Sequence, residues 1–171
     1  SPRVEEVAAD TVVLDLEGLE HLFGSPREIA GEMARIAAES GLAVNVAVAA
    51  NPEAAVHAAR GFAGITVIPP GEEAGVLGRL PLRLLAPPPE VEETWSLWGL
   101  RCFRDLAALP ETGGAERLGP EGVRLQKLAR GAGTRPAGSA LPIRRPARRR
   151  DRGRAPRGRA RLDGACGPGA R

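Results

Sequence analysis

The chain opens with two short segments whose apolar residues are valine and leucine. Residues 4–7 and 12–16 favour β structure. The residues between them form a short connection that ends at Asp10 and Thr11. The sequence therefore predicts a hairpin with Asp10 near its tip.

Helical spacing follows the hairpin. Ser25 and Glu28 form a capping box around Pro26, which predicts the start of a helix. Gly41 supplies a stop signal. The apolar positions that keep one helical face between these limits are Ile29, Met33, Ile36 and Ala37.

A second strand and helix follow the stop signal. Residues 44–49 are apolar enough for an interior strand, and Asn51 with Pro52 predicts a helix that ends near Gly61. Residues 65–68 form a third β segment, closed by two prolines and a glycine. The order of a β-hairpin, α, β, α, β predicts an α+β fold.

Strand signals disappear after Gly71, and short helices are expected over residues 72–80, 91–98, 103–109 and 121–129. Trp95 and Trp98 lie at helical i, i+3 spacing, which favours a role in the core over stacking on bases. The expected breaks between helices fall at residues 86–89, 113–114 and 119–120.

Charge separates the end of the chain from the rest. Twelve arginines and two aspartates follow Gly131, in a segment of mostly Arg, Ala, Gly and Pro that cannot form a core and is expected to be disordered. The rest of the chain is acidic. We therefore expect three parts, residues 1–80, a helical domain over 81–131, and a basic tail over 132–171.

Cysteine and hydropathy patterns exclude several classes of protein. Cys102 and Cys166 lack metal-ligand spacing, and no apolar run approaches the roughly 20 residues that span a bilayer. No zinc site, disulfide framework or membrane association is predicted, and a reducing cytoplasm fits best.

The succession of these segments resembles the Y-family translesion DNA polymerases, the DinB/UmuC group, and most closely their ImuB-like branch. Residues 4–18 are similar to the hairpin of the polymerase palm domain, and Leu22-Phe23-Gly24 with residues 46–51 keep the order of the next motifs. Residues 98–101, 105–110 and 128–131 are similar to helix-hairpin-helix segments of the thumb. The resemblance implies a partial ferredoxin-like βαβ palm, then a small all-helical thumb.

The resemblance also implies a metal site that this chain does not complete. Active members bind two Mg²⁺ ions with an early-strand Asp and an Asp-Glu pair in the hairpin, because Mg²⁺ demands hard oxygen ligands. Here Asp10 matches the Asp of that pair, Thr11 stands at the Glu position, and the early strand is not in this sequence. We expect no catalytic residue and no cofactor in this chain, with Asp10 as a weak metal-site remnant or an ordinary turn residue.

A second departure concerns the nucleotide. The family pattern places Lys residues that face the triphosphate where this chain has Pro52 and Val56, and neither side chain can pair with a phosphate. His57 is expected to be a half-exposed helix residue rather than a substitute. Asp15 is expected to be structural, and His21 has no catalytic partner in the sequence.

DNA contact is predicted in the thumb. Helix-hairpin-helix units hold DNA through backbone amides presented from a glycine-containing turn. The expected first hairpin has become Ala86 and three prolines, which removes amides, whereas the second keeps its glycines. This second turn either contacts DNA or only caps the helix that follows. The candidate DNA-contacting residues are Gly119, Gly122, Arg124, Lys127 and Arg130.

These expectations define a catalytically degenerate polymerase homologue in DNA repair and mutagenic translesion synthesis, a DNA-binding or scaffolding subunit near the nucleoid. The resemblance implies weak binding to primer-template DNA and three partners: a sliding clamp, a RecA-like accessory protein and an error-prone replicative-type polymerase. One alternative is an active DNA polymerase in a longer protein with an upstream strand. Another is a non-functional truncated product, in which residues 132–171 come from a shifted reading frame rather than forming a nucleic-acid-binding arm.

Without the early strand, the palm sheet has an edge with unpaired backbone groups. A marginally stable or aggregation-prone fold is therefore expected.

Overall fold

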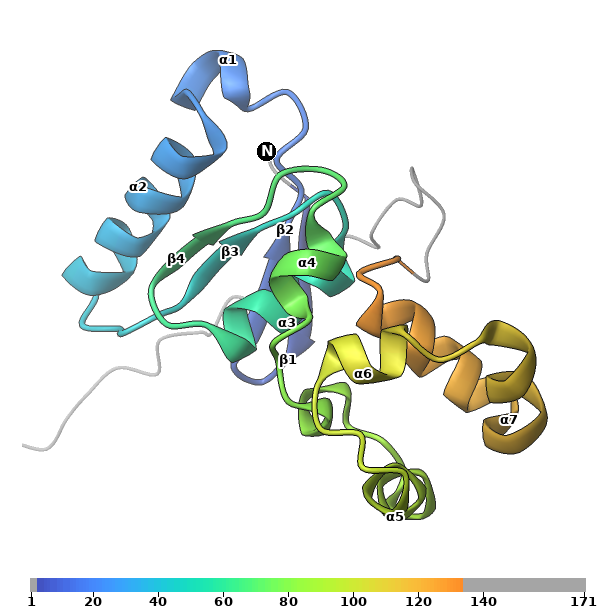
Figure 1. Cartoon of the computed structure of the whole chain (residues 1–171). Helices are drawn as coiled ribbons and strands as arrows, with labels where there is room; N and C mark the ends of the chain where they lie inside the picture. The colour runs from blue at the N-terminus through green and yellow to red at the C-terminus, as the bar shows by residue number, and fades with distance from the viewer. Residues whose placement is uncertain (1–2, 134–171) are drawn as a thin grey trace, which may run out of the picture.

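The computed structural model describes residues 3–133, with the backbone alone described over residues 111–118. A small β-rich part with its helices lies on one side, and a cluster of short helices lies on the other (Figure 1). The elements of the first part are β1 (Val4–Ala8), β2 (Thr11–Leu14), α1 (Glu20–Phe23), α2 (Pro26–Glu39), β3 (Val46–Val48), α3 (Pro52–Gly61) and β4 (Ile65–Val67). Those of the second are α4 (Glu73–Leu77), the 3₁₀ helix η1 (Leu82–Leu85), α5 (Pro89–Leu97), α6 (Phe103–Ala107) and α7 (Glu111–Ala129).

The four strands form two separate pairs. β1 and β2 pair antiparallel with Glu5 opposite Val13, which confirms the predicted hairpin. β3 and β4 pair in parallel with Ala47 opposite Thr66, and α3 makes the crossover between them. The predicted α+β class is therefore confirmed, although β2 and β3 are not hydrogen-bonded to each other.

A cavity of about 90 Å³ lies between the hairpin and the parallel pair. Its walls come from β2, β3, α3 and Met33 of α2, and nearly all of them are apolar. β1 occupies only one edge of β2, and β4 occupies only one edge of β3. The lining residues are Thr11, Val12, Val13, Leu14, Leu16, Met33, Val46, Ala47, Val48, Ala55, Val56 and Ala59.

Local sequence signals set both ends of α2. The Ser25 hydroxyl accepts from the Glu28 amide, and the Glu28 carboxylate accepts from the Ser25 amide at 2.7 Å, so the predicted capping box is confirmed. At the other end Gly41 has φ 76°, and a Schellman pattern of hydrogen bonds closes the helix. The predicted apolar face is only partly correct, because Ile29 is buried while Ile36 is 52% exposed.

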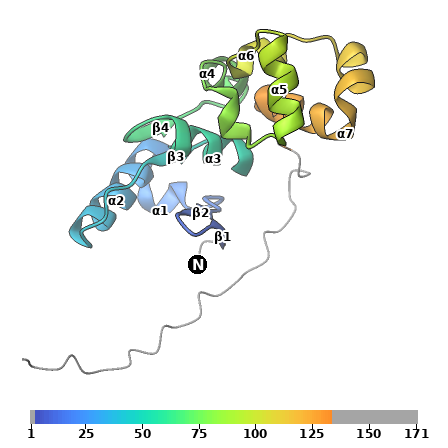
Figure 2. The same cartoon turned by 90° about the horizontal axis from the view of Figure 1, so that it is seen from below.

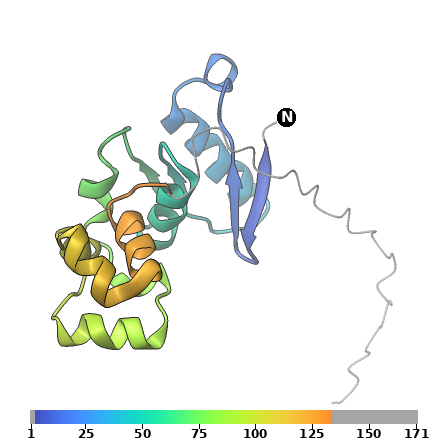
Figure 3. The same ribbon diagram turned by 90° about the vertical axis from the view of Figure 1, so that its right-hand side faces the viewer.

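α3 begins and ends as predicted. The Asn51 side chain accepts from the Ala54 amide at 2.8 Å, and Pro52 occupies the first turn. α2 and α3 both pack against β3 and β4. α3 also faces the second part of the molecule, so it lies between the hairpin and the helical cluster (Figure 3).

One hydrophobic core joins α3 to the helical cluster. Of the buried apolar residues in the described part of the chain, only Ile29 and Ala30 precede Ala54. The core crosses residue 80, which was the predicted boundary between two domains. Its members are Ala54, Ala58, Ile68, Leu77, Leu80, Leu82, Leu85, Trp95, Phe103, Leu106, Leu125, Leu128 and Ala129.

The helical cluster differs from the prediction at three places. Residues 113–114, expected to break the chain, lie inside α7, whereas Gly119 with φ 64° and ψ −171° does interrupt it. Trp95 is buried as predicted, but Trp98 is 37% exposed. The helix expected over residues 72–80 is shorter and ends at Leu77. Viewed from below, α4 to α7 gather at the end of the molecule away from the hairpin (Figure 2).

Candidate metal-site remnant and nucleic-acid interface

Asp10 lies at the exposed turn of the hairpin, as predicted, and its carboxylate is engaged locally. The Thr11 hydroxyl donates to Asp10 Oδ1 at 2.8 Å. Arg60, from the last turn of α3, donates from Nη2 to the Thr11 hydroxyl at 3.3 Å. The Thr11 hydroxyl therefore lies between the Arg60 guanidinium and the Asp10 carboxylate.

This arrangement does not fit a two-Mg²⁺ site. Mg²⁺ requires several oxygen ligands in near-octahedral geometry, and a neighbouring cation opposes its binding. Among the described residues, no group of three or more His, Cys, Asp or Glu side chains could hold a metal ion. Sequence spacing could not predict the contact of Arg60, because 49 positions separate it from Thr11.

The two positions where the family pattern expects lysines serve the fold here. Pro52 occupies the first turn of α3 beneath the Asn51 cap. Val56, one turn later, lines the apolar cavity between β2 and β3. Neither side chain offers a cation to a phosphate.

His57 is buried, with only 8% of its surface exposed, so the expectation of a half-exposed residue is wrong. Its ring meets Phe103 edge-on, with centroids 5.5 Å apart, and its Nδ1 is buried without a hydrogen-bond partner in the described structure. Burial lowers the pKa of His57, with a further lowering by Arg60 that Glu53 partly opposes. His57 shares the buried face of α3 with Ala54 and Ala58, so helical spacing was the signal that could have predicted its burial.

Asp15 and His21 lie outside the candidate metal site and the candidate nucleic-acid interface. Asp15 Oδ1 accepts from the Glu17 amide at 3.1 Å, and Asp15 Oδ2 lies 3.9 Å from Arg3 Nη1. These local contacts agree with a structural role. His21 is exposed on α1.

The predicted DNA-contacting turn lies at the interruption of α7. Gly119 takes a positive φ that other residues rarely adopt, and a second helical segment starts at Pro120. Gly122 is buried in the first turn of that segment. The turn thus presents the start of a helix, but Glu121 places a carboxylate there.

The three basic residues of the predicted interface have different surroundings. Arg124 forms a two-point ion pair with Glu121, with distances of 2.6 and 2.9 Å, which raises the pKa of Arg124 and lowers the pKa of Glu121. Arg130 donates from Nε to the Ala107 carbonyl at 3.0 Å and from Nη2 to the Leu109 carbonyl at 3.1 Å. Lys127 is exposed and, within the described residues, has no ion pair or hydrogen bond of its side chain.

The end of α7 is fastened to the start of α3. Asn51 Nδ2 donates to the Gly131 carbonyl at 2.9 Å. A Cβ on Gly131, whose φ is 73°, would lie 2.3 Å from Glu73 Cβ. The hydrogen bond between Asn51 and Gly131 therefore helps to hold the two parts of the molecule together, a role that sequence spacing did not indicate.

Known proteins align with most of this chain. A protein named DNA polymerase IV 2 from Mesorhizobium japonicum is 32% identical over 134 residues, which is 75% of this chain and 32% of that protein. Protein ImuB from Caulobacter vibrioides is 31% identical over 147 residues, 86% of this chain and 31% of its own length. DNA polymerase IV from Dehalococcoides mccartyi is 32% identical over 142 residues, covering 80% of this chain and 36% of that protein. No family model matches the chain.

The fold and these similarities define an α+β relative of DNA polymerases and ImuB proteins. More narrowly, the chain is a partial relative of the Y-family DNA polymerases and ImuB-like proteins. It spans about a third of the length of the curated relatives it matches. Within its described residues, no helix has the length and hydropathy to cross a bilayer.

Proposed function

We propose that this chain is part of a catalytically degenerate Y-family relative that serves DNA damage tolerance as a DNA-binding or scaffolding subunit. The observation that carries the proposal is the hydrogen-bonded chain from Arg60 through Thr11 to Asp10. In it the one carboxylate that matches the family's metal site is held by a hydroxyl donor. The clamp, the RecA-like accessory protein and the error-prone polymerase implied by the resemblance are its proposed partners.

DNA contact in this proposal comes from the second segment of α7. Lys127 is the side chain best placed to gain a phosphate, because Arg124 and Arg130 already have partners in the described structure. Exposed lysines contribute to DNA affinity through release of counterions, which makes the affinity depend on salt.

Fluorescence anisotropy with labelled primer-template DNA tests this contact in the whole chain. Lys127→Ala is expected to weaken binding and to reduce the slope of log affinity against log salt by about one. Arg27→Ala, which removes an exposed arginine from α2, is the matched control for net charge. An unchanged slope in Lys127→Ala would exclude this residue from the DNA interface.

A primer-extension assay with Mg²⁺ or Mn²⁺ tests degeneracy. We expect no incorporation by the chain, or by a version extended at the N-terminus with the preceding residues of its gene. Incorporation that Asp10→Ala abolishes would establish the second candidate, an active polymerase.

That second candidate has one observation in its favour. The cavity between β2 and β3 is flanked by two strand edges that no described strand occupies, and Thr11, next to Asp10, lines it. A further strand inserted there would run past the hairpin tip and could carry a second carboxylate to Asp10. Arg60 and the positions of Pro52 and Val56 would still differ from the active pattern.

A further inference from the structure

Two segments that are distant in the sequence pair within the helical cluster. Three backbone hydrogen bonds link residues 78–83 to residues 101–104, at distances of 2.9, 2.9 and 3.2 Å. Pro81 and Cys102 form an antiparallel bridge between them. Leu80 and Phe103 are buried in the core, whereas the arginines of both segments are exposed. These are Arg79, Arg83, Arg101 and Arg104.

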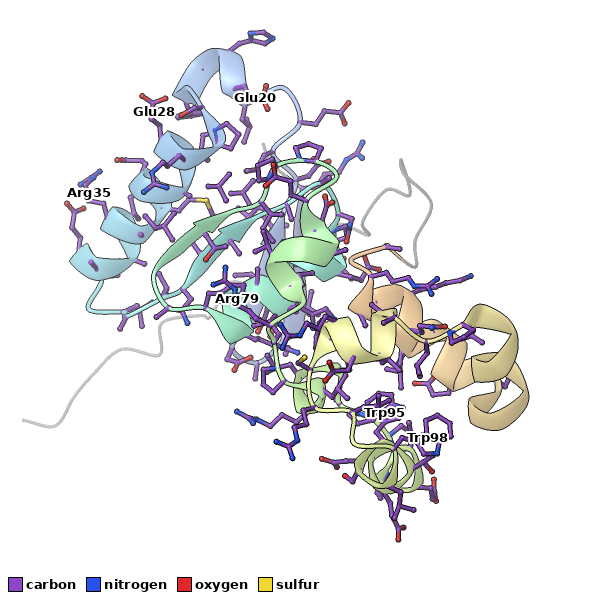
Figure 4. All side chains as sticks on the ribbon, viewed as in Figure 1. Glu20, Glu28, Arg35, Arg79, Trp95 and Trp98 are labelled. Atoms are coloured by element: carbon purple, nitrogen blue, oxygen red, sulfur yellow. The ribbon has the colours of Figure 1, made fainter. Side chains whose placement is uncertain are left out.

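The Arg79 guanidinium is held in place by an aromatic ring. Its Cζ lies over Phe62, 5.1 Å from the ring centroid, and its Nε lies 3.5 Å from the Val76 carbonyl oxygen. Figure 4 shows Arg79 beside α3, well apart from Trp95 and Trp98. Arg79 has no ion pair among the described residues, so its charge is positioned but not neutralised.

Arg104 lies next to Arg79 across the paired segments. A Cβ on Gly78 would lie 3.3 Å from Arg104 Cβ, and the Arg104 side chain is 77% exposed. Its Nε is 3.8 Å from Asp105 Oδ1. The other oxygen of Asp105 accepts from the amides of Arg101 and Cys102 at 2.9 and 3.0 Å, so this carboxylate serves the start of α6. An exposed ion pair at such a distance is weak, which leaves Arg104 available to an anion.

The two ends of the paired segments differ in their carboxylates. Arg83 and Arg101 line a cavity of about 240 Å³ between η1 and α5, and Glu92 of α5 lines it with them. This carboxylate offsets the two cations. Arg79 and Arg104 form the more strongly positive end, which we call the Arg79–Arg104 surface.

The chemistry of the Arg79–Arg104 surface favours a phosphodiester chain over an acidic peptide. Neither of the two cavities described above is lined by Arg79 or Arg104, so an apolar side chain of a peptide gains no anchor in them. A peptide would depend on exposed ion pairs, which contribute little. A DNA backbone carries a charge on every phosphate and releases counterions when arginines neutralise it, and a guanidinium can donate two hydrogen bonds to one phosphate.

We propose that the Arg79–Arg104 surface binds the sugar-phosphate backbone of DNA. Each guanidinium pairs with a phosphate, and Phe62 holds that of Arg79 in position. The inference rests on the proposed function, because it requires that the chain meets DNA. It uses the link between α4 and η1 together with α6, whereas the contact at Lys127 uses α7, so each contact can fail without the other.

Fluorescence anisotropy of the whole chain with labelled primer-template DNA tests the charges. In the double variant Arg79→Gln and Arg104→Gln, the slope of log affinity against log salt should fall by about two, and affinity at low salt should fall about tenfold. The matched control is Arg27→Gln with Arg35→Gln, which removes the same charge from α2 and should leave the slope unchanged. The arginines after Gly131 are common to all these proteins, so they do not affect the comparison.

A charge-conserving variant separates DNA contact from folding. Arg79→Lys with Arg104→Lys keeps both charges and should keep the wild-type slope. A slope as low in this variant as in the glutamine variant would overturn the proposal, because the arginines would then act through the structure. Circular dichroism checks the folding of each variant.

Arginine modification with phenylglyoxal, followed by mass spectrometry of the peptides, locates the contact. Saturating DNA should slow modification of Arg79 and Arg104 several-fold while Arg27 reacts as before. Equal protection by poly-glutamate at the same concentration of charge would overturn the proposal and assign the surface to an acidic protein. An unchanged slope in the glutamine variant, with a reduced slope in Lys127→Ala, would overturn this inference alone. No saturable binding of DNA by the wild type would overturn the proposed DNA contact as well.

Discussion

Residues 4–48 and residues 52–131 reach their structures by different means. The first region has its turn, its capping box and its strand register, yet it contributes only Ile29 and Ala30 to the buried apolar residues of the described chain. The second has weaker local signals but nearly the whole core. The comparison shows that local sequence signals can specify helices and strands even where few apolar side chains are buried. The large apolar residues left exposed in the first region are Val7, Val12, Leu22, Phe23, Ile36, Leu42 and Val44.

A pair of phenylalanines gives the largest expected contrast between the regions. Phe103→Ala should lower the free energy of unfolding by about 3–5 kcal/mol, because Phe103 is fully buried against the core and His57. Phe23→Ala, at a position 57% exposed, should change it by less than about 0.5 kcal/mol. Urea denaturation followed by circular dichroism measures both free energies. Similar losses in the two variants would contradict the difference between the two regions.

Two glycines with nearly the same backbone angle give the next contrast. Gly131→Ala should cost about 2–4 kcal/mol, from strain at positive φ together with the overlap between the new Cβ and Glu73. Gly41→Ala, where a Cβ meets nothing within 4 Å, should cost only the strain, about 1 kcal/mol. The same denaturation measurement applies, and equal costs would mean that the end of α7 is not tightly docked.

Two helix caps give a smaller difference. Asn51→Ala removes both the α3 cap and the bond to Gly131, so about 1–2 kcal/mol should be lost. Ser25→Ala removes a cap on exposed α2 and should cost about 0.5–1 kcal/mol. Thermal melting of the two variants checks the order, which the reverse ranking would contradict.

The smallest expected effect is a pH dependence. Because burial holds the pKa of His57 below its ordinary value of about 6.5, the unfolded chain takes up a proton first as pH falls. The contribution of His57 to stability is therefore complete above about pH 6.5 and declines below it, until the folded protein is protonated too. His57→Leu should flatten that part of the stability profile, and His21→Leu, which keeps the buried histidine, is the control. If the slope of stability against pH is unchanged in His57→Leu, other titratable groups cause the pH dependence.

The sequence predicted features whose causes are local. The hairpin, the capping box at Ser25, the Asn51 cap and the glycine at position 119 each follow from a few neighbouring residues, and the structure has all four. Their success reflects turn and cap geometry, which depends little on the rest of the fold.

Features that depend on distant contacts were harder to predict. The edge-on contact of His57 depends on Phe103 of α6, and the environment of Asp10 depends on Arg60. Helical spacing placed Ile36 and Trp98 on apolar faces, but no neighbouring element covers them fully. The same limit applies to the predicted DNA-binding residues, since the hydrogen bonds of Arg130 to α6 are invisible in the spacing of α7.

The bond between Asn51 and Gly131 has a mechanical consequence. The backbone passes from β4 to α4 near residue 70, and the hydrophobic core already packs α3 against the helical cluster. The return of the chain to Asn51 adds a polar attachment at the N-cap of α3. A force applied to the end of α7 would therefore be transmitted to the start of α3.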